Sequence, residues 1–152
     1  MKWRFVDLDD EIVASAGKAI PEIFAEDGEE RFRDLESKVL QTVSSSQHQV
    51  VSTGGGIVTD EGNRTTMASS GFVVLLDASP ETILQRLQNQ GSNERGVVRP
   101  MLDSDDPLER IRSLKSQRQV HYTTAHYTID TDGLTPVQVA GKIVAARIMQ
   151  ND

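Results

Sequence analysis

The sequence predicts an α/β protein in which helices cover a parallel β-sheet. Short apolar segments of strand length alternate along the chain with segments of helical periodicity, and this alternation is typical of parallel sheets. The segment Phe72–Leu76 is apolar throughout, which fits a strand buried on both faces. The chain of 152 residues is long enough for one domain with a core. We therefore expect a single domain over residues 1–152.

The first half of the chain is predicted to contain two strands and three helices. The strands are expected over residues 3–7 and 50–53, and the helices over 9–16, 28–43 and 60–69. Gly17 is expected to end the first helix. In the longest helix, four apolar residues recur at spacings of three and four and so share one face. These residues are Phe32, Leu35, Val39 and Val43.

The second half is predicted to continue the alternation. The strands are expected over residues 72–76 and 127–131, and the helices over 80–90, 107–123 and 136–149. Residues 91–106 are polar and contain glycine, so we expect a long loop there, and a loop of that length is often functional. The expected core face of the last helix consists of Val137, Ala140, Val144 and Ile148.

Composition excludes several classes of partner. The net charge is −7 and the pI is about 4.9, so the chain lacks the clustered cations that nucleic acids and anionic membranes require. It has no cysteine, which excludes disulfides and thiolate metal sites. No apolar run is long enough to span a membrane. We expect a cytoplasmic protein with neither nucleic-acid nor membrane partners.

Two aspartates, Asp7 and Asp9, follow the first expected strand. Ligands in parallel-sheet folds bind at the carboxyl ends of the strands. One aspartate could hold Mg²⁺, mostly through water, and the other could accept hydrogen bonds from substrate hydroxyls. The alternative is that Asp9 caps the following helix and Asp7 is solvated.

Arginines on two expected helices could bind a carboxylate, because a guanidinium makes two parallel hydrogen bonds to one. Arg33 neighbours Phe32, so it could lie close to the protein body. The alternative for Arg33 is a surface ion pair with Glu29. Arg118 could be a second anion ligand, or simply a favourable charge near a helix C-terminus.

Three glycines, Gly54, Gly55 and Gly56, follow the second expected strand. They permit positive φ angles and close backbone approach to a ligand, although a plain tight turn is the alternative. They do not form a nucleotide-phosphate loop, because the pattern GxxxxGK[ST] is absent.

The expected loop 91–106 carries Arg99 within the motif Arg99-Pro100-Met101-Leu102. An arginine there could close over phosphates and stabilise transition-state charge, and a solvated loop is the alternative. The histidines His48, His121 and His126 show no metal-ligand spacing, so we interpret them as structural or solvated.

In order and spacing, these motifs resemble the shikimate kinase family over essentially the whole chain. The resemblance rests on the segments FVDLD at 5–9, IPEIF at 20–24, STGGG at 52–56 and RPML at 99–102. It also includes Gly28-Glu29 with Phe32-Arg33 and Glu36, and Arg118 followed by Tyr122. The resemblance implies an α/β, three-layer parallel-sheet fold of the P-loop, nucleoside monophosphate kinase type.

The family's activity is transfer of the ATP γ-phosphoryl to the 3-hydroxyl of shikimate, in the chorismate pathway to aromatic amino acids. The resemblance implies that Asp7 helps hold Mg²⁺ and that Asp9 binds shikimate hydroxyls and helps orient or deprotonate the attacking one. Arg33 and Arg118 would grip the shikimate carboxylate, and Gly54, Gly55 and Gly56 would line the acceptor site. Arg99 would be the lid arginine that reaches the ATP phosphates.

The chain departs from the family pattern in two ways. Family members begin with a strand, a GxxGxGK[ST] loop and a helix before the first aspartate motif, whereas here six residues precede Asp7. We therefore expect an N-terminally truncated domain that lacks the central first strand, or a subunit completed by a partner chain. The complete protein is expected to be a monomer. The other departure is at Asp130–Leu134, where some relatives place an arginine near the adenine and this chain has none.

The departures leave two further hypotheses open. The chain could be a catalytically impaired or partner-completed shikimate-binding protein. It could also be a related kinase that acts on another small hydroxylated acid.

Overall fold

The computed structural model describes residues 2–90 and 105–150. Within the chain it separates two compact units, Met1–Gly71 and Phe72–Asp152. The expected lid segment lies outside the described residues, except for its last two positions. The predictions of a lid and of a single domain over the whole chain stay predictions.

The first unit is built on two parallel strands, β1 (Arg4–Asp7) and β2 (Gln49–Ser52). Their register pairs Val6 with Val51 and Asp7 with Ser52. Parallel pairing requires a crossover, and the helices between the two strands supply it.

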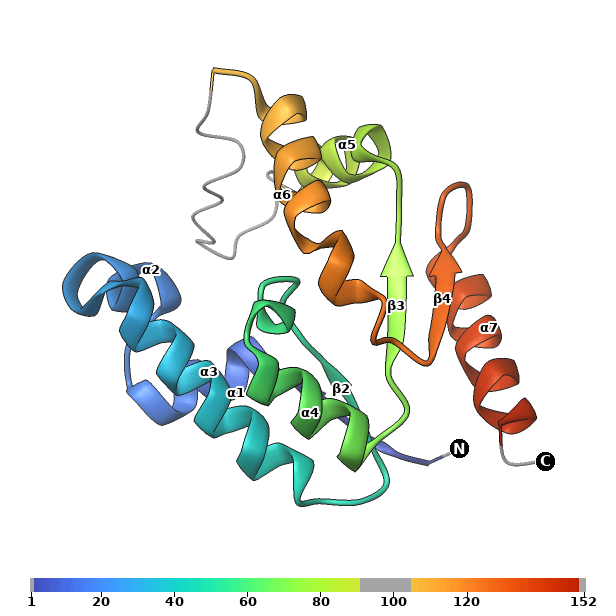
Figure 1. The fold of residues 1–152 in the computed structure, drawn as a ribbon, viewed down its shortest axis with the longest axis horizontal. Coiled ribbons are helices and arrows are strands. Elements are labelled where there is room, and N and C mark those ends of the chain that lie inside the picture. The colour runs from blue at the N-terminus through green and yellow to red at the C-terminus, as the bar shows by residue number, and fades with distance from the viewer. Residues whose placement is uncertain (1, 91–104, 151–152) are drawn as a thin grey trace. The chain divides into compact units, whose positions relative to one another are not determined.

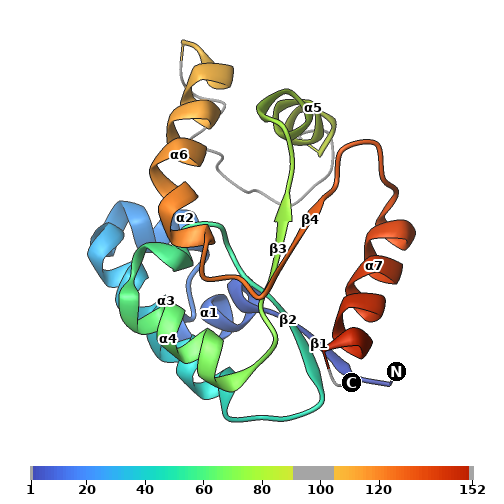
Figure 2. The same ribbon diagram turned by 45° about the vertical axis from the view of Figure 1, so that its right-hand side comes forward.

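Those helices are α1 (Leu8–Ala16), α2 (Ile20–Glu22), the π-helix η1 (Ile23–Asp27) and α3 (Gly28–Ser44). Gly17 ends α1 with φ 67°, as predicted, because glycine adopts this left-handed conformation without steric cost. After β2 come a 3₁₀ turn, η2 (Ile57–Thr59), and α4 (Glu61–Ser70). Figures 1 and 2 show α4 beside α3.

The core of the first unit is a contiguous apolar cluster between α1, η1, α3 and η2. The predicted face of α3 is confirmed: Phe32 and Val39 are buried, and Leu35 and Val43 pack against the cluster. The buried members are Leu8, Ile12, Ile23, Phe32, Val39, Leu40 and Ile57.

The second unit has a second parallel pair, β3 (Val74–Asp77) and β4 (Tyr127–Asp130). Its helices are α5 (Pro80–Gln90), α6 (Pro107–Tyr122) and α7 (Pro136–Met149). Figures 1 and 2 show β3 and β4 side by side, with α7 next to β4.

Two predictions for this unit are wrong. Leu76 is 52% exposed, so β3 is not buried on both faces; its side chain lines an open pocket instead. The predicted core face of α7 is exposed, with Val137 at 81% and Ile148 at 55%. Since α7 is apolar on nearly every side, the spacing of its apolar residues is compatible with more than one buried face. The more buried face carries Val139, Ile143 and Ala146.

Among the described residues, each sheet has two strands, and the missing central strand stays a prediction. No helix in the described ranges has the length and apolar character needed to cross a bilayer.

Candidate functional site

The register of β1 and β2 brings the candidate acceptor residues of the first unit to one sheet edge. Asp7 pairs with Ser52, so the chain leaves both strands at the same level. It then enters α1 on one side, which carries Asp9 in its first turn, and the glycine turn on the other. Strands that end together explain why motifs more than forty residues apart in sequence meet in the fold.

Asp7 is the N-cap of α1: its Oδ1 accepts a hydrogen bond from the backbone N–H of Asp9 at 2.9 Å. The alternative that Asp9 is the cap is therefore wrong. The strand runs directly into the helix, so the last strand residue becomes the capping position. The cap fixes one Asp7 oxygen and directs Asp9 out from the first turn.

Asp9 lies at the surface, but its carboxylate is partly desolvated. This burial, together with the neighbouring charges of Asp7 and Asp10, raises the pKa of Asp9 above its ordinary value, and Arg33 opposes the shift. The interaction with Arg33 shows that Asp9 and Arg33 belong to one electrostatic environment. Two candidate site residues from different helices are thus brought together.

A buried carboxylate, that of Glu36, fixes the position of the Arg33 guanidinium. Its Nη1 donates to Glu36 Oε2 at 2.7 Å, and the Glu36 side chain is only 2% exposed. The alternative pair with Glu29 also forms, at 3.5 Å, but Glu29 is 69% exposed. Exposed pairs contribute little to positioning, so the buried partner decides where the guanidinium lies. The sequence analysis assigned Glu36 no role, although its spacing of three from Arg33 and its place in the family motif are signals that could have found it.

In the glycine turn, residues 54–56, the backbone comes close to the Arg33 side chain at Gly56. A Cβ built there would lie 2.7 Å from Arg33 Nη2 and 2.8 Å from Nη1, closer than real contacts allow. The positive-φ glycines of the described chain are Gly17, Gly28 and Gly133, so the triple glycine does not use the positive φ angles that it permits. A side chain at Gly56 would have to displace the Arg33 guanidinium, which packs against the turn.

The other predicted arginines do not lie in the first unit. Arg118 is on α6 of the second unit, where it is partly buried. Within the part of the chain that the structure describes, Arg118 forms no ion pair or hydrogen bond. Arg99 lies outside the described residues.

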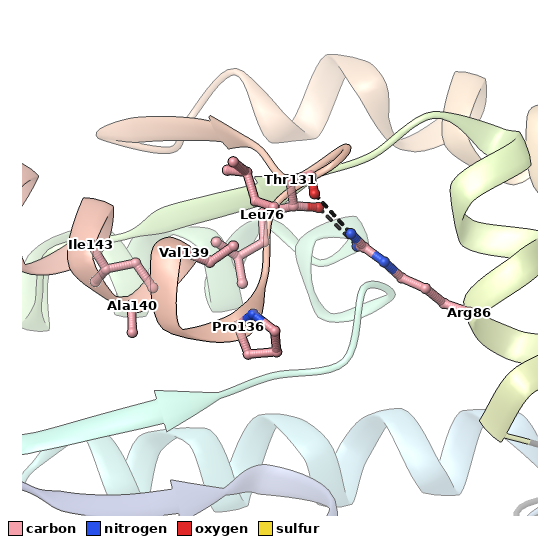
Figure 3. A pocket seen from close by; sticks show the side chains of 8 residues that line it. Leu76, Arg86, Thr131, Pro136, Val139, Ala140 and Ile143 are labelled. Atoms are coloured by element: carbon pink, nitrogen blue, oxygen red, sulfur yellow. Dashed lines mark hydrogen bonds between the residues drawn. The ribbon is translucent and has the colours of Figure 1, made fainter.

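The second unit contains a pocket of about 470 Å³ beside β4 and α7 (Figure 3). Arg86 donates to Thr131 at its rim, through Nη1 to Oγ1 and through Nη2 to the carbonyl oxygen, each at 2.8 Å. A mostly apolar wall with few fixed polar groups is typical of a small-molecule site. The lining residues are Leu76, Arg86, Thr131, Leu134, Pro136, Val139, Ala140 and Ile143.

Among the described residues, no group of three or more acidic or histidine side chains could hold a metal ion. Asp7 nevertheless fits a magnesium site as a single contributor, since Mg²⁺ usually takes one or two carboxylates together with water and substrate phosphates. The interpretation of His126 as structural is confirmed, because its Nδ1 accepts a hydrogen bond from the Val73 N–H at 3.0 Å.

The comparisons with known proteins point to one family. The family model described as Shikimate kinase matches residues 1–147. A curated shikimate kinase from Thermodesulfovibrio yellowstonii is 40% identical over 142 residues, which cover 93% of this chain and 79% of that protein. One from Parasynechococcus marenigrum is 42% identical over 142 residues, covering 93% and 71%.

Solved structures agree. Shikimate kinase from Acinetobacter baumannii in complex with shikimate matches with a TM-score of 0.84 and 32% identity, over 99% of this chain and 80% of that one. Shikimate kinase from Aquifex aeolicus matches with a TM-score of 0.80 and 30% identity, over 98% and 83%. These matches confirm the predicted parallel-strand α/β fold of the P-loop, nucleoside monophosphate kinase type.

Proposed function

The chain belongs to the shikimate kinase family, and we propose that it binds shikimate through Asp9, Arg33, Arg118 and the glycine turn and phosphorylates its 3-hydroxyl with ATP. The observation that carries the proposal is the Arg33 guanidinium, which buried Glu36 holds against Gly56 beside Asp9. A cation fixed in this way is ready to receive a planar carboxylate through two parallel hydrogen bonds. Arg118, which has no anionic partner among the described residues, is the second ligand of that carboxylate.

Asp9 is the proposed contact for the shikimate hydroxyls. A carboxylate accepts hydrogen bonds from hydroxyls and can take a proton from the attacking one. The raised pKa of Asp9 increases its basicity relative to an ordinary aspartate. Proton transfer from the 3-hydroxyl to Asp9 would accompany attack of that oxygen on the γ-phosphorus.

For the binding of the phosphoryl donor, ATP, we propose two residues and one pocket. Asp7 would share in holding Mg²⁺, which neutralises phosphate charge when bound. Arg99 would contact the phosphates. The pocket at Arg86, Thr131 and Pro136 adjoins the segment where some relatives contact adenine, so we assign it to the nucleotide base.

A calorimetric titration with shikimate tests the acceptor site without requiring turnover. Arg33→Ala should weaken shikimate binding roughly ten- to a hundredfold, the effect of losing a charge-assisted hydrogen-bonded contact. Arg31→Ala is the matched control, since Arg31 is an exposed arginine on the same helix. Equal shikimate affinity for wild type and Arg33→Ala would refute the carboxylate assignment.

The second candidate function is shikimate binding without phosphorylation, or phosphorylation only with a partner chain. In the family, the lysine of the phosphate-binding loop meets the β- and γ-phosphates, and the pattern GxxxxGK[ST] does not occur within the 152 residues. A coupled ADP-release assay on this chain distinguishes the two functions. Shikimate-dependent ADP release supports the first, and tight shikimate binding with no ADP release supports the second. Titration with other small hydroxylated acids tests the choice of acceptor.

A further inference from the structure

Helix α6 contacts its own unit through both apolar and polar side chains. Ile111 is its one fully buried residue within the described chain. A narrow apolar contact leaves rotation of a helix about its own axis weakly determined, because hydrophobic burial is non-directional. Ion pairs and hydrogen bonds must therefore contribute to fixing which way the side chains of α6 point.

The most enclosed of these contacts is made by Lys115. Its Nζ lies 2.7 Å from Asp77 Oδ1 and donates at 2.5 Å to the carbonyl oxygen of Ala78. The Lys115 side chain is 25% exposed and that of Asp77 is 37% exposed. The other ion pair of α6, between Arg112 and Glu81, is 50% and 60% exposed, so solvent screens it more.

Asp77, with which Lys115 forms its ion pair, is itself held by further hydrogen bonds. Asp77 is the last residue of β3, and its Oδ1 also accepts from the Ala78 N–H at 2.9 Å. The Asp77 carbonyl oxygen accepts from both the N–H and the hydroxyl of Thr131, each at 2.8 Å. Lys115 therefore connects α6 to the carboxyl end of β3, which is hydrogen-bonded to β4.

Arg118 follows Lys115 by one helical turn, and residues three apart are neighbours on a helix surface. We propose that Lys115 is a positioning residue: its contacts with Asp77 and Ala78 set the rotation of α6 and so set the direction in which the Arg118 guanidinium leaves the helix. This inference rests on the proposed function, because it takes Arg118 as a shikimate ligand. Lys115 itself touches no substrate in this role.

The test measures shikimate affinity by calorimetry for Lys115→Met, which keeps the length of the side chain and removes its charge and donors. We expect roughly a five- to tenfold loss of affinity, since small displacements of a binding group are costly. Arg112→Met is the matched control; it breaks an ion pair of the same 2.7 Å length on the same helix and should leave affinity unchanged. Lys115→Arg, which keeps the charge, should retain most of the affinity.

A double variant separates positioning from a general effect on folding. If Lys115 acts through Arg118, then Lys115→Met with Arg118→Ala should bind shikimate as weakly as Arg118→Ala alone. Additive losses, or unchanged affinity for Lys115→Met, would overturn the inference. Absence of shikimate binding by the wild-type chain would instead refute the proposed function, and this inference with it.

Discussion

The two units of the chain stabilise their candidate binding residues in different ways. In the unit Met1–Gly71, seven buried apolar side chains form one cluster beneath Arg33, Glu36 and the glycine turn. Among the described residues of the unit Phe72–Asp152, four apolar residues are buried: Ala78, Ile111, Ile129 and Ala146. Both units expose large apolar side chains, for example Phe5 in the first and Val137 in the second.

This difference indicates which contacts each half depends on. In the first unit, packing of the apolar face fixes the helix that carries Arg33, and the buried Glu36 carboxylate fixes the guanidinium. The second unit depends more on directional polar contacts, such as Arg86 with Thr131 and Lys115 with Asp77. The predictions below test that contrast, beginning with the largest effect.

Truncating the core of the first unit should cost the most. Leu8 is fully buried, and Leu8→Ala should lower the free energy of unfolding by about 2–5 kcal/mol, as buried leucines do elsewhere. Ile148→Ala removes a side chain of the same size that is 55% exposed and should cost less than about 1 kcal/mol. Urea unfolding followed by circular dichroism measures both. Equal losses would remove the contrast between the units.

Filling the space at Gly56 should disturb the site more than the fold. In Gly56→Ala the new methyl group would displace the Arg33 guanidinium, which lies 2.7 Å from the Cβ position. Shikimate affinity should fall roughly tenfold, as expected when a charged ligand-binding group is moved. The control is Gly141→Ala on α7, where a Cβ meets nothing within 4 Å. Wild-type affinity for Gly56→Ala would mean that Arg33 does not bind the ligand where it now lies.

Asp9 should make the smallest contribution, and one that depends on pH. Its pKa is raised in the folded state, so from about pH 4 up to that raised pKa the native chain binds more protons than the unfolded one. The Asp9 contribution to stability is therefore fully present below the unfolded pKa and is lost as pH rises through the folded pKa. In Asp9→Asn this loss should disappear, so the variant should gain stability relative to wild type as pH rises, while ADP release falls. Urea midpoints from acid to neutral pH check this, and a parallel pH dependence in both proteins would contradict it.

Local patterns predicted the four strands and the longer helices to within two residues, because caps, glycines and prolines mark their ends, but they did not predict the short α2, η1 and η2. The α3 face was also predictable, since Phe32 and Val39 lie on a helix with one apolar stripe. The α7 face was not, because an all-apolar helix leaves the choice to its neighbours. The contacts of Arg33 with Glu36 and of Lys115 with Asp77 depend on three-dimensional geometry that spacing alone does not specify.

The central claim is that the first unit holds a preformed carboxylate site at Arg33. The most direct test is an NMR titration of the ¹⁵N-labelled chain with shikimate, following the Arg33 side-chain N–H and the Gly56 amide. The account predicts that both signals shift together and saturate with one dissociation constant, and that Arg33→Ala abolishes the Gly56 shift. Shikimate binding that leaves both signals unchanged would contradict it.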